Sequence, residues 1–138
     1  MTKIEALEQE IYNEGIELFE HDIDDKAAIA KNSFITAIVY NKKKIKDDCD
    51  YLVALSHEYG HYSTATYYHP YMLKSYKWKM DYEANLNSVR RLVPIKKLKQ
   101  LMREGVNRFE ISLEFCVPED FVDEAVHIYQ RKGLLPWR

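Results

Sequence analysis

Two histidines and a glutamate stand close together as an H-E-x-x-H pattern formed by His57, Glu58 and His61. On a helix, residues four apart project from the same face, so the two histidines can direct imidazole nitrogens at one metal ion. Neutral imidazole suits Zn²⁺, and a carboxylate beside it can act as a base towards water that the cation acidifies. The pattern is typical of a zinc-dependent protease with one catalytic ion, in which His57 and His61 are ligands and Glu58 is the catalytic base.

A catalytic zinc site also needs a third protein ligand and an open position for water. The metzincin arrangement is excluded because Thr64 and Tyr67 stand where that pattern requires glycine and histidine. A carboxylate on a later helix is the alternative solution. Glu83 follows residues 62–82, which leave room for a turn and an antiparallel return of the chain. The spacing favours Glu83 and leaves Asp81 and His69 open as alternatives.

Two supporting roles follow from such a centre. Asn87, one helical turn beyond Glu83, is predicted to hydrogen-bond a ligating histidine. A donor for the oxyanion of the reaction is also expected nearby. The sequence does not choose among the tyrosines that could provide it: Tyr62, Tyr67, Tyr68 and Tyr71.

The elements that would position these residues differ in character along the chain. Apolar side chains at helical spacing predict a helix over residues 3–20, and a β-branched and aromatic run predicts the best of two or three short antiparallel strands at 34–40. Asp47 and Asp48 introduce a helix over about 48–67, which ends at His69-Pro70. Further helices are predicted at about 75–92, 95–103, 109–115 and 119–132, the last followed by Gly133.

This order predicts an α+β fold that is mainly helical. A small antiparallel sheet precedes the H-E-x-x-H helix, and about residues 94–138 form a helical C-terminal subregion of one domain, 1–138. No apolar run approaches the length that spans a bilayer, and the N-terminus lacks the apolar block of a signal peptide. We therefore expect a cytoplasmic protein, with Cys49 and Cys116 as reduced thiols.

Two separated motifs resemble those of the ImmA/IrrE metallopeptidases of phages, integrative elements and bacterial chromosomes. They are the segment 55–61, Leu-Ser-His-Glu-Tyr-Gly-His, and the segment 82–85, Tyr-Glu-Ala-Asn, which is followed by Leu92-Val93-Pro94. The resemblance covers about residues 30–132. Tyr59 departs from the family's usual leucine, and Asn87-Ser88-Val89 departs from a commoner small or aromatic cluster.

The resemblance implies a zincin-like fold and a gluzincin-like site in which His57, His61 and Glu83 bind zinc and Glu58 is the base. It also implies an endopeptidase that cleaves a helix-turn-helix repressor, often encoded beside it, and so relieves repression. The expected partner is thus a protein substrate, without a membrane and without direct binding to nucleic acid. The chain resembles the minimal, phage-type members, which carry no sensor domain.

Two rival interpretations remain. Residues 94–132 have the apolar spacing of a helix-turn-helix, and seven of the charged residues from Arg90 to Arg108 are basic while one is acidic. A DNA-binding role is disfavoured because the acidic run around Glu119 and Asp120 would stand at the start of the recognition helix and repel phosphate. The second rival is a zinc-stabilised regulatory module that binds protein or DNA without proteolysis.

Overall fold

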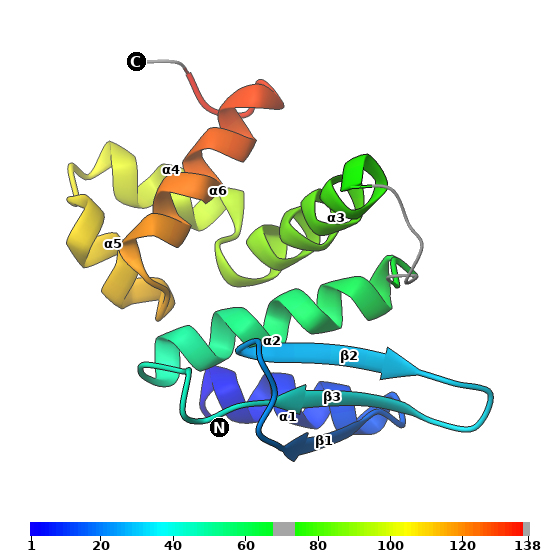
Figure 1. Ribbon diagram of the computed structural model, residues 1–138. Helices are drawn as coiled ribbons and strands as arrows, with labels where there is room; N and C mark the ends of the chain where they lie inside the picture. Colours follow the sequence, from blue (N-terminus) through cyan, green and yellow to red (C-terminus); the bar gives the residue numbers. More distant parts are fainter. Residues whose placement is uncertain (68–73, 137–138) are drawn as a thin grey trace. The chain divides into compact units, whose positions relative to one another are not determined.

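The computed structural model describes residues 1–67 and 74–136, in which six helices and three strands follow one another along the chain (Figure 1). The chain divides into two compact units, residues 1–88 and residues 89–138. Helix α3 (Lys74–Leu92) runs from the first unit into the second. The class is α+β, as the sequence predicts. No helix in these described ranges is long and apolar enough to cross a membrane.

Helix α1 (Lys3–Asn13) is shorter than predicted. Thr2 caps it, with a side chain that accepts a hydrogen bond from the N–H of the third helical residue. The helix ends before Gly15, whose φ of 78° places it in the left-handed region that favours glycine. Strand β1 (Glu17–Glu20) follows directly. The helix predicted over 3–20 is therefore wrong beyond Asn13, because the turn at Gly15 converts its last residues into a strand.

The sheet contains β1, β2 (Ala27–Lys31) and β3 (Thr36–Tyr40) in the order β1-β3-β2. Strands β2 and β3 pair antiparallel, as predicted, but β1 pairs with β3 in parallel. The predicted purely antiparallel sheet is thus corrected to a mixed one. The reason lies in the connection: after β1 the chain passes to the far edge, so that β2, and not β1, forms the hairpin with β3.

Helix α2 (Asp48–Ser63) carries the H-E-x-x-H pattern. Asp47 caps its start by accepting a hydrogen bond from the N–H of Asp50 at 2.8 Å. The helix ends four residues before the predicted end at 67, because Ala65 adopts a left-handed φ of 54°. The predicted stop at His69-Pro70 lies outside the described residues.

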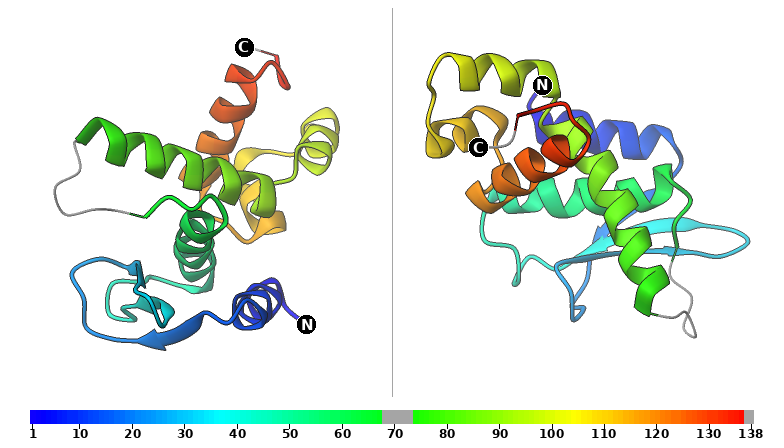
Figure 2. Two further views of the ribbon diagram at one scale, coloured as in Figure 1. Left: turned by 90° about the vertical axis from the view of Figure 1, so that its right-hand side faces the viewer. Right: turned by 90° about the horizontal axis from the view of Figure 1, so that it is seen from above.

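The core of the first unit lies between the sheet and the two helices α1 and α2. These helices contact each other; α1 also contacts β1, and α2 contacts β2 and β3 (Figure 2). Three apolar side chains of α2 are buried: Leu52, Leu55 and Tyr59. They pack in a core with Leu7, Ile11, Ile16 and Ile38. The face of α2 that carries His57 and His61 is therefore held in place by the packing of the opposite, apolar face.

The second unit contains α4 (Ile95–Arg103), α5 (Arg108–Phe115) and α6 (Glu119–Arg131), within one residue of the predicted bounds. Their apolar faces build a separate core of Leu98, Leu101, Ile111, Phe115, Phe121, Val122, Ala125 and Ile128. The hydroxyl of Tyr129 donates to the carbonyl of Val93 at 2.7 Å and joins α6 to the chain before α4. This unit corresponds to the predicted helical C-terminal part.

Candidate metal centre

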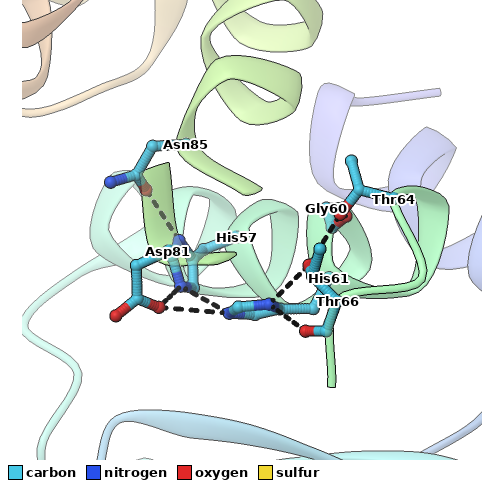
Figure 3. A network of polar contacts seen from close by, with 7 residues as sticks. All are labelled: His57, Gly60, His61, Thr64, Thr66, Asp81 and Asn85. Carbon is cyan, nitrogen blue, oxygen red and sulfur yellow. Dashed lines mark hydrogen bonds and ion pairs between the residues drawn. The ribbon is translucent and has the colours of Figure 1, made fainter. Parts of the chain in front are cut away.

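His57 and His61 project from the same face of α2, one turn apart (Figure 3). Their rings meet edge to face with centroids 4.7 Å apart, and their Nε2 atoms are 3.1 Å apart. The side chain of His61 is 1% exposed, whereas that of His57 is 24% exposed. The pair is therefore held rigidly on one side and open to solvent on the other.

Asp81 of α3 brings a carboxylate to the two histidines (Figure 3). Its Oδ1 lies 3.4 Å from Nε2 of His57 and 3.3 Å from Nε2 of His61. Among the described residues, these three form the one group whose ligand atoms all lie within 4.8 Å of one another. The structure thus assembles a His-His-Asp set at the place where the sequence predicts a metal.

Glu83, the predicted third ligand, is not a member of this group. It stands two residues after Asp81, and two residues correspond to about 200° of rotation around a helix axis. The two side chains therefore leave α3 on different sides. The structure corrects the carboxylate: Asp81, which the spacing had left as an alternative, takes the place beside the histidines that was expected for Glu83.

The crossing of α2 and α3 brings Asp81 within reach. The hydroxyl of Ser88 donates to that of Ser56 at 2.8 Å, and both side chains are fully buried. One turn away, Gly60 lies against the backbone of Ala84, where an added Cβ would stand 2.7 Å from the Ala84 carbonyl oxygen. The small residues let the two helices cross at close range, which sets the position of Asp81.

We expect Gly60→Ala to reduce the free energy of unfolding by about 1–3 kcal/mol, the usual cost of overpacking a close contact. Alanine improves helix propensity by about 1 kcal/mol, but the Cβ meets backbone that cannot rotate away. Chemical denaturation of the metal-free variant measures this change. Ser63→Ala, an exposed change on the same helix, should stay within about 0.5 kcal/mol of the unsubstituted protein. Equal stability of the Gly60→Ala variant would show that the helices can separate without cost.

Each histidine is oriented through its Nδ1 atom (Figure 3). Nδ1 of His57 lies 2.7 Å from Oδ1 of Asn85, and Nδ1 of His61 lies 2.6 Å from the carbonyl oxygen of Thr66 and 3.0 Å from its hydroxyl. Amide and carbonyl oxygens only accept hydrogen bonds, so each Nδ1 donates and carries the proton. Each Nε2 then carries no proton, and its lone pair faces the carboxylate of Asp81.

These three donors fit a zinc ion. Three lone pairs that converge at separations of 3.1–3.4 Å repel one another unless positive charge lies between them. Ligands about 2.0–2.1 Å from a tetrahedral zinc ion lie about 3.3 Å from each other, which agrees with the three separations. Two imidazoles and a carboxylate suit zinc better than Mg²⁺ or Ca²⁺, which prefer oxygen. The side chain of Asp81 is 43% exposed, so one side of the group stays open to water or substrate.

Asn85, and not the predicted Asn87, supports the histidine. Oδ1 of Asn87 is buried and has no hydrogen-bond partner in the described structure. The prediction of Asn87 is corrected for the same reason as that of Glu83: if Asp81 is the metal-facing residue, the residue one turn further on the same face is Asn85. The role was expected, but it was placed two residues too late.

Asn85→Ala should weaken zinc binding by about 10–100-fold, the usual effect of removing a partner that orients a ligating histidine. The measurement is a titration against a chromophoric zinc chelator. Asn87→Ala on the same helix is the matched control and should keep the affinity within a few-fold. Equal losses in both variants would indicate a general disturbance of α3 and would remove the orienting role of Asn85.

Glu58 lies beside this group and is 9% exposed. Burial raises the pKa of its carboxyl to about 8, with added repulsion from the carboxylates of Asp81 and Asp25; a hydrogen bond from the backbone N–H of Ile29 opposes the shift. In the metal-free protein the carboxyl is therefore largely protonated at neutral pH. Such a raised pKa is typical of a group that exchanges protons in a reaction.

This pKa predicts that the metal-free protein loses stability as pH rises. Between the ordinary value of 4.5 and about 8, the folded state holds a proton that the unfolded state has released, so stability falls across that window, by up to about 5 kcal/mol. Glu58→Gln should abolish this decline. Urea denaturation from pH 5 to 9 measures the difference between the two proteins. The pKa of His61 is lowered by burial and then by His57, so His61 makes stability rise with pH below 6.5. This contribution is the same in both proteins and cancels when their curves are compared. Parallel curves would contradict the shift.

The tyrosines proposed as oxyanion donors are placed only in part. The hydroxyl of Tyr62 donates to Glu14 at 3.2 Å and is therefore engaged elsewhere. The ring of Tyr67 lies 5.3 Å from the ammonium of Lys31. The other candidates for donor or ligand lie outside the described residues: Tyr68, His69 and Tyr71.

Comparison of the chain with protein-family models, with curated proteins and with solved structures gave no match. The chemistry of this centre therefore rests on its own residues and their geometry.

Proposed function

We propose that this chain is a zinc-dependent endopeptidase with His57, His61 and Asp81 as ligands and Glu58 as the catalytic base. The observation that carries the proposal is the convergence of two Nε2 atoms and one carboxylate oxygen, with a buried carboxyl beside them. The pairing of a His-His-Asp set with an adjacent acid is the combination that metal-assisted hydrolysis of a peptide requires. A metal that only stabilised the fold would have no use for that acid.

When bound, a zinc ion there supplies a Lewis acid for the peptide carbonyl, acidifies water and lowers the pKa of Glu58 by its charge. Glu58 then takes a proton from the attacking water and delivers it to the nitrogen of the leaving amine. Asn85 and Thr66 keep the histidines in the tautomer that leaves Nε2 available. The buried side of His61 excludes bulk water from that edge of the site.

Strand β2 is an outer strand of the sheet and passes beside Glu58, an arrangement that favours an extended peptide as substrate. The carbonyl of Lys26, just before β2, accepts a hydrogen bond from the N–H of Asn41 at 2.8 Å, and the N–H of Asn32, just after β2, donates to the carbonyl of Ile35 at 3.0 Å. Because every second residue of an antiparallel strand bonds to the same neighbour, Ala28 and Ala30 form the other hydrogen bonds to β3. The intervening residues direct their N–H and C=O groups to the opposite side, where the N–H of Ile29 reaches Glu58. A peptide can add to such an edge as a further strand.

The substrate that we propose is a helix-turn-helix repressor of a phage or mobile element. This part rests on the likeness of the segments 55–61, 82–85 and 92–94 to the ImmA/IrrE metallopeptidases. Asp81 directly precedes the second of these segments, so using it as ligand keeps the spacing between the two motifs. Cleavage of such a repressor in the cytoplasm would relieve repression.

The test is to incubate the zinc-loaded protein with a helix-turn-helix repressor encoded beside its gene. We expect two discrete fragments, with the cut bond identified by mass spectrometry. A chelator should stop the reaction, and added zinc should restore it. If the repressor forms a complex with the zinc-loaded protein but stays intact, the chain is a zinc-stabilised binding module and the proposal of a protease is wrong.

A further inference from the structure

Two aromatic side chains of α3 stack in the first unit, one of them exposed and the other half-buried. The rings of Trp78 and Tyr82 lie with centroids 5.6 Å apart and planes 10° apart. They are four residues apart, so they stand on one face of the helix. Trp78 is 67% exposed. The pair thus presents an ordered, apolar surface to solvent, and such surfaces commonly mark a place of interaction.

This face of α3 is the face that builds the metal centre. Trp78, Asp81, Tyr82 and Asn85 follow the spacing of three and four residues that aligns side chains along a helix. Asp81 and Asn85 contact the histidines of α2. Trp78 therefore continues the same face from Asp81 towards the start of α3, and Tyr82 stands next to Asp81. A peptide held at the open side of Asp81 would have a side chain within reach of these rings.

The charges around the pair select the kind of side chain. Lys74 and Lys77 stand four residues and one residue before Trp78, and Lys79 follows it. Their ammonium groups disfavour an arginine or lysine above the rings. A carboxylate would be attracted by the three lysines, but above the rings it would meet their negative faces and the repulsion of Asp81. A large uncharged apolar side chain, such as leucine or phenylalanine, is the remaining class.

We propose that Trp78 and Tyr82 form a substrate subsite that accepts a large apolar side chain of the peptide being cleaved. The subsite rests on the proposed function, since it needs a peptide at the metal centre. It makes the chain selective at one position, at a fixed distance from the cut bond. Tyr76, which is 58% exposed but lies two residues from Trp78 and thus on another side of α3, takes no part in it.

The test uses end-blocked, alanine-based hexapeptides that carry one Leu, Phe, Lys or Glu at each position in turn. With the zinc-loaded protein, we expect Leu and Phe at one fixed position to raise the rate of cleavage about five- to tenfold over Ala, and Lys and Glu to give no gain. Trp78→Ala should abolish this preference, Trp78→Phe should keep most of it, and Tyr76→Ala should leave it unchanged. Zinc affinity should be the same in all four proteins.

A second measurement reads binding without cleavage. Trp78 and Trp137 are the two tryptophans of the sequence, so Trp137→Phe combined with Glu58→Gln gives a zinc-loaded, inactive protein in which Trp78 alone reports. Its fluorescence should change saturably with the Leu and Phe peptides, and not with the Lys or Glu peptides.

The outcomes separate the subsite from the protease. Cleavage by the unsubstituted protein with the same side-chain preference in Trp78→Ala would overturn the subsite and leave the protease intact. Apolar-selective fluorescence without cleavage of the peptides or of the repressor would support an apolar binding site at Trp78 and overturn the protease. Fluorescence that does not respond to the Leu and Phe peptides would overturn the subsite in either case.

Discussion

Asp81→Asn should weaken zinc binding by at least about a hundredfold, whereas Glu83→Gln should leave it within a few-fold. Both substitutions remove one negative charge from α3 and keep the size of the side chain, so they differ only in the side of the helix that they change. Asp81 Oδ1 lies within 3.4 Å of both Nε2 atoms, and Glu83 is outside the group. An amide in place of the carboxylate loses the charge that balances the cation, which explains a loss larger than that of an orienting partner.

Competition with a chromophoric chelator at fixed pH measures both affinities, and far-ultraviolet circular dichroism checks that α3 is retained. A loss of zinc in Glu83→Gln with normal affinity in Asp81→Asn would reverse the assignment. It would mean that α3 rotates by about two residues when the metal binds. Equal and normal affinity in both variants would remove α3 from the metal centre altogether.

The choice between Asp81 and Glu83 shows where sequence reasoning reaches its limit. The spacing after His61 predicted a carboxylate on the returning helix, and that helix is α3. Which of two nearby carboxylates faces α2 depends on the rotation of α3 about its own axis, and tertiary packing sets that rotation. The small residues that pack against α2 are Ala84 and Ser88. Asp81 stands three residues before Ala84 and thus shares its face. The pattern of small residues on α3 therefore indicates which of the two carboxylates faces α2.

The first helix shows a second limit. Residues 3–20 have apolar side chains at helical intervals throughout, so periodicity alone predicts one helix. The structure ends α1 at Asn13 and uses the last part of that segment as β1. Gly15 was visible in the sequence, but only its positive φ, together with pairing of β1 to a strand more than fifteen residues later, makes it a helix end. Long-range pairing of this kind has no local signature.

The supporting residues could be predicted by role more easily than by position. A partner for one ligating histidine was expected, and the structure supplies two, Asn85 for His57 and Thr66 for His61. Thr66 follows the end of α2 and reaches back because Ala65 adopts a left-handed conformation. The contact of the Ile29 N–H with Glu58 joins a strand and a helix that are separated in the chain. Such contacts between elements depend on the final packing and not on spacing within one element.

Glu58→Gln should reduce the rate of repressor cleavage by about 10²–10⁴-fold while zinc affinity stays near that of the unsubstituted protein. The range is the usual contribution of a positioned general base. Within the described part of the chain Glu58 belongs to no group of candidate ligands, so removing its charge leaves the three donors in place. Glutamine fills the same volume and can still accept the N–H of Ile29. The variant therefore isolates proton transfer from metal binding and from folding.

Glu83→Gln is the matched control for this experiment, because it makes the same chemical change on the neighbouring helix outside the metal group. It should cleave at close to the normal rate. If Glu58→Gln cleaves equally fast, the proton acceptor lies elsewhere and the buried carboxyl has another role. If both variants bind zinc and repressor, and neither they nor the unsubstituted protein cuts it, binding alone is the function. A loss confined to Glu58→Gln with zinc retained can arise only if the chain performs hydrolysis through this carboxyl, which makes this single substitution the sharpest separation of a protease from a zinc-stabilised binding module.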